Sequence, residues 1–214
     1  AIRRFVNVPQ PGRARGPWLV HFAYAARNQH LWLSVSLTVA VFAYLSLARG
    51  LNPLWACLLL CFPAMYHYGN TRCLRLLHPE RGSWRIWRYM ILAQFAVVGA
   101  FLLAGIAVLA AWWPDAIASG LEPVAGVLGA VVCSVLVGSA FPAENDNPLS
   151  VLVGCLVLGI CLAFVGVIAG LFNLPGGTGV LIVALTVLAG ASSVWFINSH
   201  ERRSRYDLPQ TVLR

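Results

Sequence analysis

The chain contains no lysine, and charged residues of any kind are scarce, at 10% of its 214 residues. Soluble domains typically carry about 25% charged residues. Without lysine the chain cannot form a P-loop, a Schiff base or a lysine general base, so we expect no ATP site of the P-loop kind within it. Hydrophobic residues reach 59%, and the mean hydropathy is +0.76. These values predict an all-α integral membrane protein.

Motifs of metal-binding and hydrolytic enzymes are also missing. The sequence has no CxxC pair, no HExxH and no GxSxG. Cys57 and Cys61 lie one helical turn apart, and we interpret them as small apolar residues inside a membrane span rather than as metal ligands. We therefore expect no catalytic residue, no metal site and no cofactor, and a protein that is not an enzyme.

Two weaker alternatives start from polar residues. Glu144 and Asp146 in AENDNP could hold a divalent cation, as in membrane transferases that act on lipid phosphates, but a helix-capping turn is the preferred interpretation. A haem-binding membrane anchor would need two facing imidazoles, and only His67 is expected inside a span. We expect the histidines to be solvated by head groups and water.

Six apolar windows are long enough to cross a membrane as helices. Gly, Pro, Asn or Asp stands at each break between them. The predicted fold is therefore a polytopic bundle of six transmembrane helices, at residues 31–48, 51–68, 89–113, 123–141, 149–172 and 178–197.

Arginine positions predict the orientation of this bundle. Positive residues near helix ends stay on the cytoplasmic side, and with the N-terminus inside that side holds fourteen of the fifteen arginines, all but Arg49. Both termini are then cytoplasmic and the protein lies in the cell inner membrane. The domain organisation is an N-terminal segment, a transmembrane domain with a basic cytoplasmic loop, and a basic tail, at residues 1–30, 31–197 (loop 70–88) and 198–214.

Residues 17–30, PWLVHFAYAARNQH, predict an amphipathic helix in the membrane interface. Pro17 is suited to its first turn. Apolar side chains, with Trp18 and Phe22 as interfacial anchors, share one face, whereas His21 and Arg27 fall on the other. A simple extension of the first span is an equally good interpretation of this stretch.

The segment NTRCLRLLHPERGSWRIWRY (70–89) is the most distinctive stretch of the sequence. Its arginines could bind anionic lipid head groups, with Trp84 and Trp87 in the interfacial belt. It could also dock on a cytoplasmic subunit through arginines and leucines. The expected docking residues are Arg72, Arg75, Leu76, Leu77, Arg81, Arg85 and Arg88.

The order of elements resembles that of ABC-2 type permeases, the membrane subunits of a class of ABC exporters. These have an interfacial helix, two spans, a cytoplasmic coupling helix and four further spans, and CLRLLHPERGSWRIWRYMILAQ is similar to the pattern at their coupling position. The resemblance implies a dimer of such subunits, each resting on a separate ATPase. It implies that residues 71–88 transmit the closure of that ATPase.

The interior of the spans is poor in polar groups, which suits a protein driven by a separate ATPase better than a self-powered carrier. Gln94 and Ser134 are the main candidates for interior polar contacts. The main alternative is a non-catalytic accessory subunit of a secretion or respiratory complex. In each case we expect a homo- or hetero-oligomer without nucleic acid, with close helix packing at Gly126, Gly129, Gly166 and Gly170.

Overall fold

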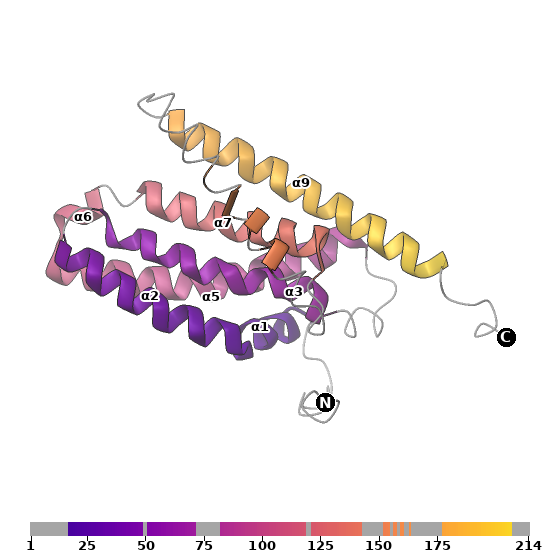
Figure 1. The fold of residues 1–214 in the computed structure, drawn as a ribbon, viewed down its shortest axis with the longest axis horizontal. Coiled ribbons are helices and arrows are strands. Elements are labelled where there is room, and N and C mark those ends of the chain that lie inside the picture. The colour runs from indigo at the N-terminus through magenta and orange to yellow at the C-terminus, as the bar shows by residue number, and fades with distance from the viewer. Residues whose placement is uncertain are drawn as a thin grey trace.

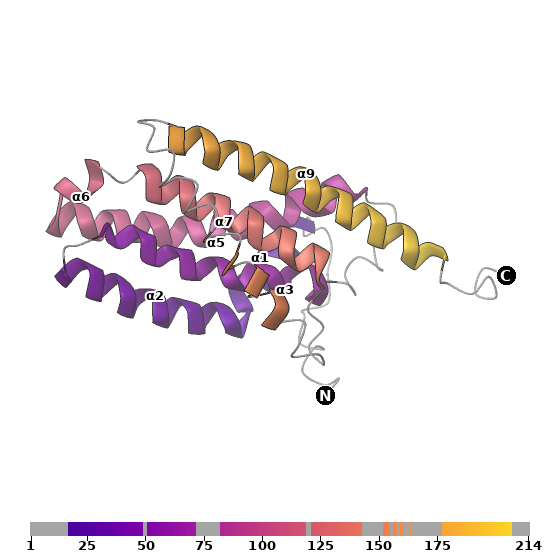
Figure 2. The same cartoon turned by 45° about the horizontal axis from the view of Figure 1, so that its top comes forward.

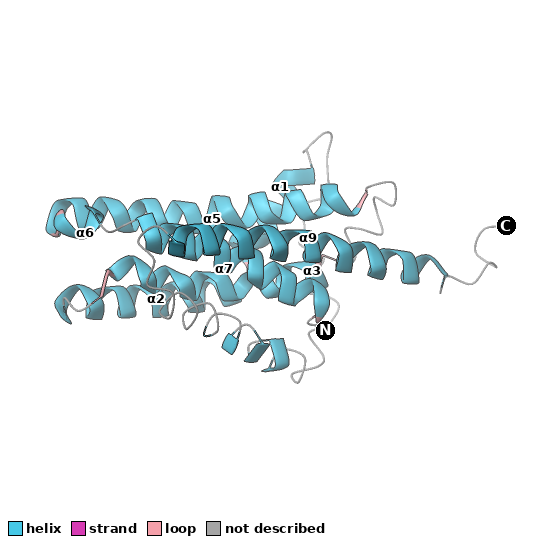
Figure 3. Ribbon diagram, turned by 90° about the horizontal axis from the view of Figure 1, so that it is seen from above, coloured by secondary structure: helices cyan, strands magenta, loops and turns pink. Residues whose placement is uncertain are grey.

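A computed structural model describes residues 17–48, 51–71, 82–118, 121–142 and 177–206, together with 152–154, 156, 157, 159, 160 and 163. These residues form helices and turns and no strand (Figure 3). Four of the helices contain segments long and apolar enough to cross a membrane, at Gln29–Ala48, Ser83–Trp112, Glu122–Ala140 and Ile182–Arg202. The chain is therefore a helical membrane protein.

The helices follow the predicted windows with shifted bounds. Proline, glycine or a polar residue stands near most of their ends, where each can interrupt helical hydrogen bonding. In chain order the elements are α1 (Pro17–Arg27), α2 (Gln29–Ala48), η2 (Pro53–Ala64), α3 (Met65–Asn70), α5 (Ser83–Trp112), α6 (Asp115–Ala118), α7 (Leu121–Ala140) and α9 (Gly177–Tyr206).

The second window forms a continuous helical run of two types, the 3-10 helix η2 followed by α3. Pro53 begins it, and the Asn52 side chain accepts a hydrogen bond from the Leu54 backbone N–H at 3.0 Å. A 3-10 helix rises about 2.0 Å per residue and an α-helix about 1.5 Å, so the run spans about 33 Å. That length matches a hydrocarbon layer of about 30 Å. A fifth crossing here stays a prediction, as does the sixth, whose window 149–172 lies largely outside the described residues.

The run η2–α3 occupies the centre of the bundle. It packs against α2, α5 and α7, and α7 in turn packs against α9. Leu60 and Ala64 of the run are fully buried. A helix that is apolar all round, as η2 is, is typical of such a central position.

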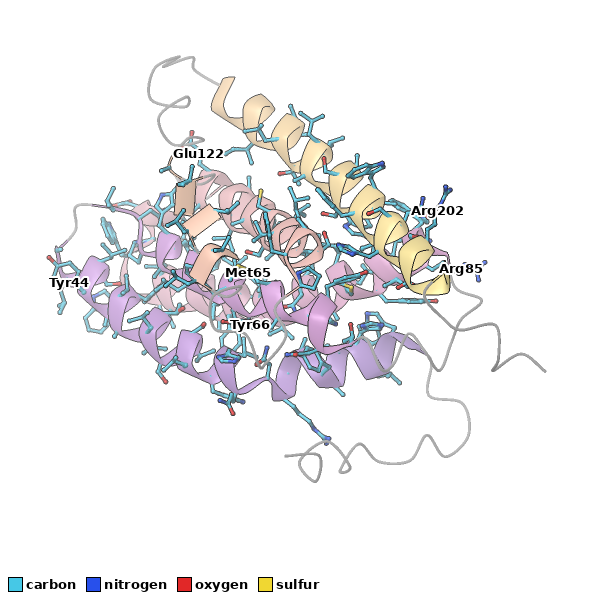
Figure 4. The ribbon with its side chains drawn as sticks, turned by 45° about the vertical axis from the view of Figure 1, so that its right-hand side comes forward. Tyr44, Met65, Tyr66, Arg85, Glu122 and Arg202 are labelled. Carbon is cyan, nitrogen blue, oxygen red and sulfur yellow. The ribbon has the colours of Figure 1, made fainter. Side chains whose placement is uncertain are left out.

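The bundle has two distinct ends (Figures 1 and 2). Helix α1, helix α3, the start of α5 and the C-terminal part of α9 lie at one end, and α6 lies at the other. Figure 4 places Arg85 and Arg202 at the first end, and Tyr44 and Glu122 away from it. We call the first the basic end, because the exposed arginines of the described residues belong to its elements: Arg27, Arg85, Arg88 and Arg202.

This gathering of arginines at one end is what the predicted orientation requires. The membrane side that this end faces stays a prediction. Helix α9 continues to Tyr206, so the boundary expected at residue 197 is not the end of a helix.

Candidate functional site

A buried polar cluster lies at the basic end, where three separate segments meet. His21 of α1, His67 of α3 and Gln94 of α5 are 6%, 0% and 2% exposed. His21 Nδ1 lies 2.9 Å from His67 Nε2, and Gln94 Nε2 lies 2.7 Å from His67 Nδ1. His67 is thus the centre of a hydrogen-bonded network that joins α1, α3 and α5.

The tautomers of the two histidines follow from which atoms can donate and which can accept a hydrogen bond. The amide nitrogen of Gln94 only donates, so His67 Nδ1 accepts from it. A neutral His67 then carries its proton on Nε2 and donates it to His21 Nδ1. The contacts of His67 with His21 and with Gln94 are both satisfied in this neutral state.

Aromatic and polar side chains surround the histidines. The Tyr24 ring lies 4.9 Å from the His67 ring, and the Tyr89 ring lies 6.2 Å from the His21 ring. Asn70 Nδ2 donates to the Tyr24 hydroxyl at 2.6 Å. Burial raises the pKa of Tyr24 from 10.0 to about 12, and the hydrogen bond from Asn70 opposes this. Tyr24 therefore remains a neutral phenol at physiological pH.

The expectation that histidines are solvated at the interface is wrong for His21 and His67. Both rings are buried and hydrogen-bonded to one another. Their arrangement also leaves no space for a haem between them. Two nitrogens on opposite sides of one iron would be about 4 Å apart, given metal–nitrogen bonds of about 2 Å.

The cluster flanks the predicted docking segment. Helix α3 ends at Asn70, and Thr71 follows as its C-terminal cap, with its hydroxyl donating to the His67 carbonyl at 2.7 Å. Helix α5 begins at Ser83, after Gly82 in the capping position. Of the predicted docking residues, Arg85 and Arg88 are exposed on α5, and the others lie outside the described residues: Arg72, Arg75, Leu76, Leu77 and Arg81.

The predicted loop is shorter than expected. The helix α5 starts at Ser83 rather than at residue 89, so residues 83–88 are part of a long helix and not of a loop. Gly82 occupies the capping position and makes no side-chain hydrogen bond. These charged residues were expected in a loop. They can be helical because an arginine can extend its head group beyond the apolar layer while its backbone stays helical.

The predicted interfacial tryptophans form one stacked pair. The rings of Trp84 and Trp87 have centroids 4.9 Å apart, and Trp84 is exposed. On α1, Trp18 stacks on Phe22 at 5.5 Å, and Trp18 is also exposed. Both pairs lie on elements of the basic end, which is a suitable depth for aromatic side chains of the membrane interface.

Glycines of α7 lie at close helix contacts. A Cβ atom on Gly126 would come within 2.7 Å of the Trp55 ring, and one on Gly129 within 2.8 Å of the Thr186 hydroxyl. Gly138, which was not among the predicted packing residues, faces the backbone carbonyl of Met65. Gly166 and Gly170 lie outside the described residues.

Cysteine and serine side chains of the interior add no reactive group. Cys57 and Cys61 are free and buried, and the Cys61 thiol donates to the Val127 carbonyl at 3.4 Å. Ser134 is buried, and its hydroxyl has no hydrogen-bond partner within the described part of the chain. Among these residues no three His, Cys, Asp or Glu side chains are grouped to hold a metal ion. The acidic stretch 143–148 lies outside them.

Comparisons of the chain with protein-family models, with curated proteins and with solved structures each return no match.

Sequence reasoning placed Gln94 inside a span but did not connect it with the histidines. The signal that could have connected them is the depth of these polar residues in the membrane. His21, His67 and Gln94 each stand near the basic end of a separate segment, and polar side chains at equal depth in neighbouring helices tend to pair because unpaired ones are costly.

Proposed function

We propose that this protein is the permease subunit of an ATP-driven exporter, with six spans in the cell inner membrane and both termini in the cytoplasm. Segment 70–88 docks on a separate ATPase subunit and couples its movements to the bundle. One observation supports this most directly: His67 connects α3, at one end of that segment, to α5 at the other end and to α1.

Such a connection suits the transmission of force. A partner that displaces segment 70–88 moves the end of α3 and the start of α5, the two elements that Gln94 and His67 hold together. Buried hydrogen bonds are costly to break, because the freed groups find no water. The displacement is therefore passed on to α1 and to the bundle rather than absorbed at the basic end.

The charge distribution at the basic end suits both proposed partners. Arg85 and Arg88 are exposed at the C-terminal end of this segment, which carries three further arginines. Leucines 76 and 77 supply an apolar surface for a groove, and arginine supplies the charged contacts of an interface. The stacked tryptophans Trp84 and Trp87 and the arginines also bind anionic lipid head groups.

The described spans carry no carboxylate near the middle of the membrane. Helices α2, η2 and α5 contain no carboxylate, and the one in α7 is Glu122 in its first turn. Carriers driven by ions need such ligands near the middle of the membrane. An ATPase on another chain, contacting an oligomer of this subunit, is the energy source that fits these helices.

The docking residues are tested by a double substitution. Replacing Leu76 and Leu77 by alanine should release the ATPase during purification in mild detergent, since truncating a central interface leucine costs about 1–2 kcal/mol. The partner is identified by a P-loop peptide and by ATP hydrolysis in the purified complex. The control replaces Leu47 and Leu51, which are 83% and 63% exposed, by alanine, and should keep the partner.

The outcomes separate the alternatives. Wild-type levels of ATPase in the double variant would contradict the docking role. A partner that belongs to a secretion or respiratory complex and hydrolyses no ATP would replace the exporter by the accessory subunit. Purification without any soluble partner would leave lipid anchoring as the role of the segment.

The orientation is tested by cysteine labelling from the two sides of the membrane. Arg81→Cys and Arg203→Cys should react only with a reagent on the cytoplasmic side, and Ala118→Cys in α6 only with one outside. Labelling of Ala118→Cys from the cytoplasm would contradict the six-span arrangement.

A further inference from the structure

We infer that His21, His67 and Gln94 form a binding site for one proton, which the two imidazole rings share. The inference concerns the chemistry of the buried cluster and does not depend on the proposed exporter. It starts from the two contacts of His67, at 2.9 Å to His21 and at 2.7 Å to Gln94.

In the neutral site, the lone pair of His67 Nδ1 can take a proton. His67 Nδ1 accepts from the Gln94 amide, and His67 Nε2 donates to His21 Nδ1. A proton taken from water binds to His67 Nδ1, and the Gln94 amide turns by about half a rotation so that Oε1 accepts from the new N–H. The contact between Gln94 and His67 is kept, and the site gains a single positive charge.

The added positive charge can reside on either ring. When the shared proton moves from His67 Nε2 to His21 Nδ1, the positive charge moves from His67 to His21, and the contact at 2.9 Å persists with donor and acceptor exchanged. His67 then remains a donor to Gln94 Oε1 through Nδ1. The two histidines therefore titrate as one group, as expected for strongly coupled sites.

A second proton does not fit. With both rings doubly protonated, His21 Nδ1–H and His67 Nε2–H would point at each other across 2.9 Å. Two positive rings would also be stacked, with centroids 5.2 Å apart. The site is therefore limited to one proton by geometry and by charge.

One aromatic ring beside the cluster can attract a cation. The Tyr24 ring centroid lies 4.9 Å from that of His67, a distance at which an aromatic ring attracts a positive charge, whereas Tyr89 lies 6.2 Å from His21. Tyr24 is neutral at physiological pH, so it does not compete for the proton.

Further titratable and charged groups lie on the elements that pack at the cluster. The exposed arginines Arg27 of α1 and Arg85 and Arg88 of α5 raise the local positive potential. From α3 come Tyr66, whose ring stacks on His30, and Tyr68, whose ring lies near His200. Helix α7 contributes Cys133 and the distant Glu122.

Protonation should tighten the contact between α1 and α3. A hydrogen bond with a charged donor is shorter and stronger than one between neutral rings. Helix α1 is thus held more firmly when the site carries its proton, and this links the position of α1 to the pH at the basic end.

The count of protons is measured by nitrogen NMR on histidine-labelled protein in nanodiscs. A variant with His30, His78 and His200 replaced by asparagine retains only His21 and His67. Between pH 8.5 and 4.5 we expect the two rings together to take up one proton, with both sets of ring-nitrogen signals changing at one common midpoint. Uptake of two protons, of none, or of one by a single ring whose neighbour does not respond would overturn the inference.

Substitutions of Gln94 provide the second measurement. Gln94→Leu removes the acceptor for the new N–H and should lower the proton affinity of the pair by about tenfold, whereas Gln94→Glu offers a permanent acceptor and should raise it. Equal affinity in the two variants would contradict the role of the turning amide. A fold control is Gly99→Ala, because Gly99 has nothing within 4 Å of an added Cβ atom, and its titration should match that of the parent protein.

Discussion

Two regions of this bundle hold their helices together by different physical means. At the basic end, His67 makes directional hydrogen bonds to two other helices from a fully buried position. Along α7, glycines let helix surfaces approach closely, and at Gly138 the added Cβ atom would meet the Met65 backbone. Close packing along α7 stabilises the bundle independently of pH, whereas the hydrogen bonds of His67 depend on the charge of the histidines.

The largest expected effect comes from the glycine region. Gly138→Ala would place its Cβ atom 2.8 Å from the Met65 carbonyl carbon, and a backbone cannot move aside as the end of a side chain can. We expect a loss of about 3 kcal/mol of unfolding free energy, as for severe overpacking. The measurement is unfolding by SDS in mixed micelles, followed by tryptophan fluorescence.

Two further glycines calibrate this expectation. Gly126→Ala meets only the edge of the Trp55 ring, which is half-buried and can turn, so it should cost less than Gly138→Ala. Gly99→Ala meets nothing and should be neutral or stabilising, by up to about 1 kcal/mol. Equal losses for the three variants would show that close approach is not what holds α7.

A smaller effect is expected at the polar contact. His67→Leu leaves the Gln94 amide and the His21 ring without their shared partner, which should cost about 2 kcal/mol. The control is His30→Leu, because His30 is partly buried and stacks on Tyr66 at 4.4 Å without joining the cluster. If both variants unfold like the wild type, the cluster contributes nothing to holding α1.

The smallest effect is expected for the tyrosine beside the cluster. Tyr24→Phe removes the hydrogen bond from Asn70 and should cost about 1 kcal/mol near neutral pH. The Tyr24 pKa of about 12 exceeds its ordinary value of 10.0, so the folded state keeps this proton longer than the unfolded state does. The stability that it contributes is complete below pH 10 and is lost between pH 10 and about 12. The unfolding free energy measured across that range should decline less steeply for Tyr24→Phe than for the wild type.

The sequence predicted the positions of most helices, for physical reasons. Hydrophobic length and helix-breaking residues located the first span to within two residues, since residues 31–48 were expected and α2 is Gln29–Ala48. The start of α5 was misplaced by six residues, because arginine and tryptophan were interpreted as loop residues, whereas they are helical. The 3-10 form of η2 was not predicted, because hydropathy is insensitive to the number of residues per turn.

The cluster could be predicted only in its parts. Gln94 was expected to make an interior polar contact, and it does so with His67. Its partners depend on which helices become neighbours, and a single sequence gives no signal for that pairing. Gly138 was missed for the same reason, since a small residue matters only when another backbone lies against it.

The central claim is that His67 holds α1 to the two helices that flank segment 70–88. Hydrogen–deuterium exchange in nanodiscs tests it most directly, by comparing His67→Leu with the wild type and with the His30→Leu control. The account predicts faster exchange over Pro17–Arg27 of α1 in His67→Leu, with α7 unchanged. Exchange of α1 at the wild-type rate in His67→Leu would contradict it.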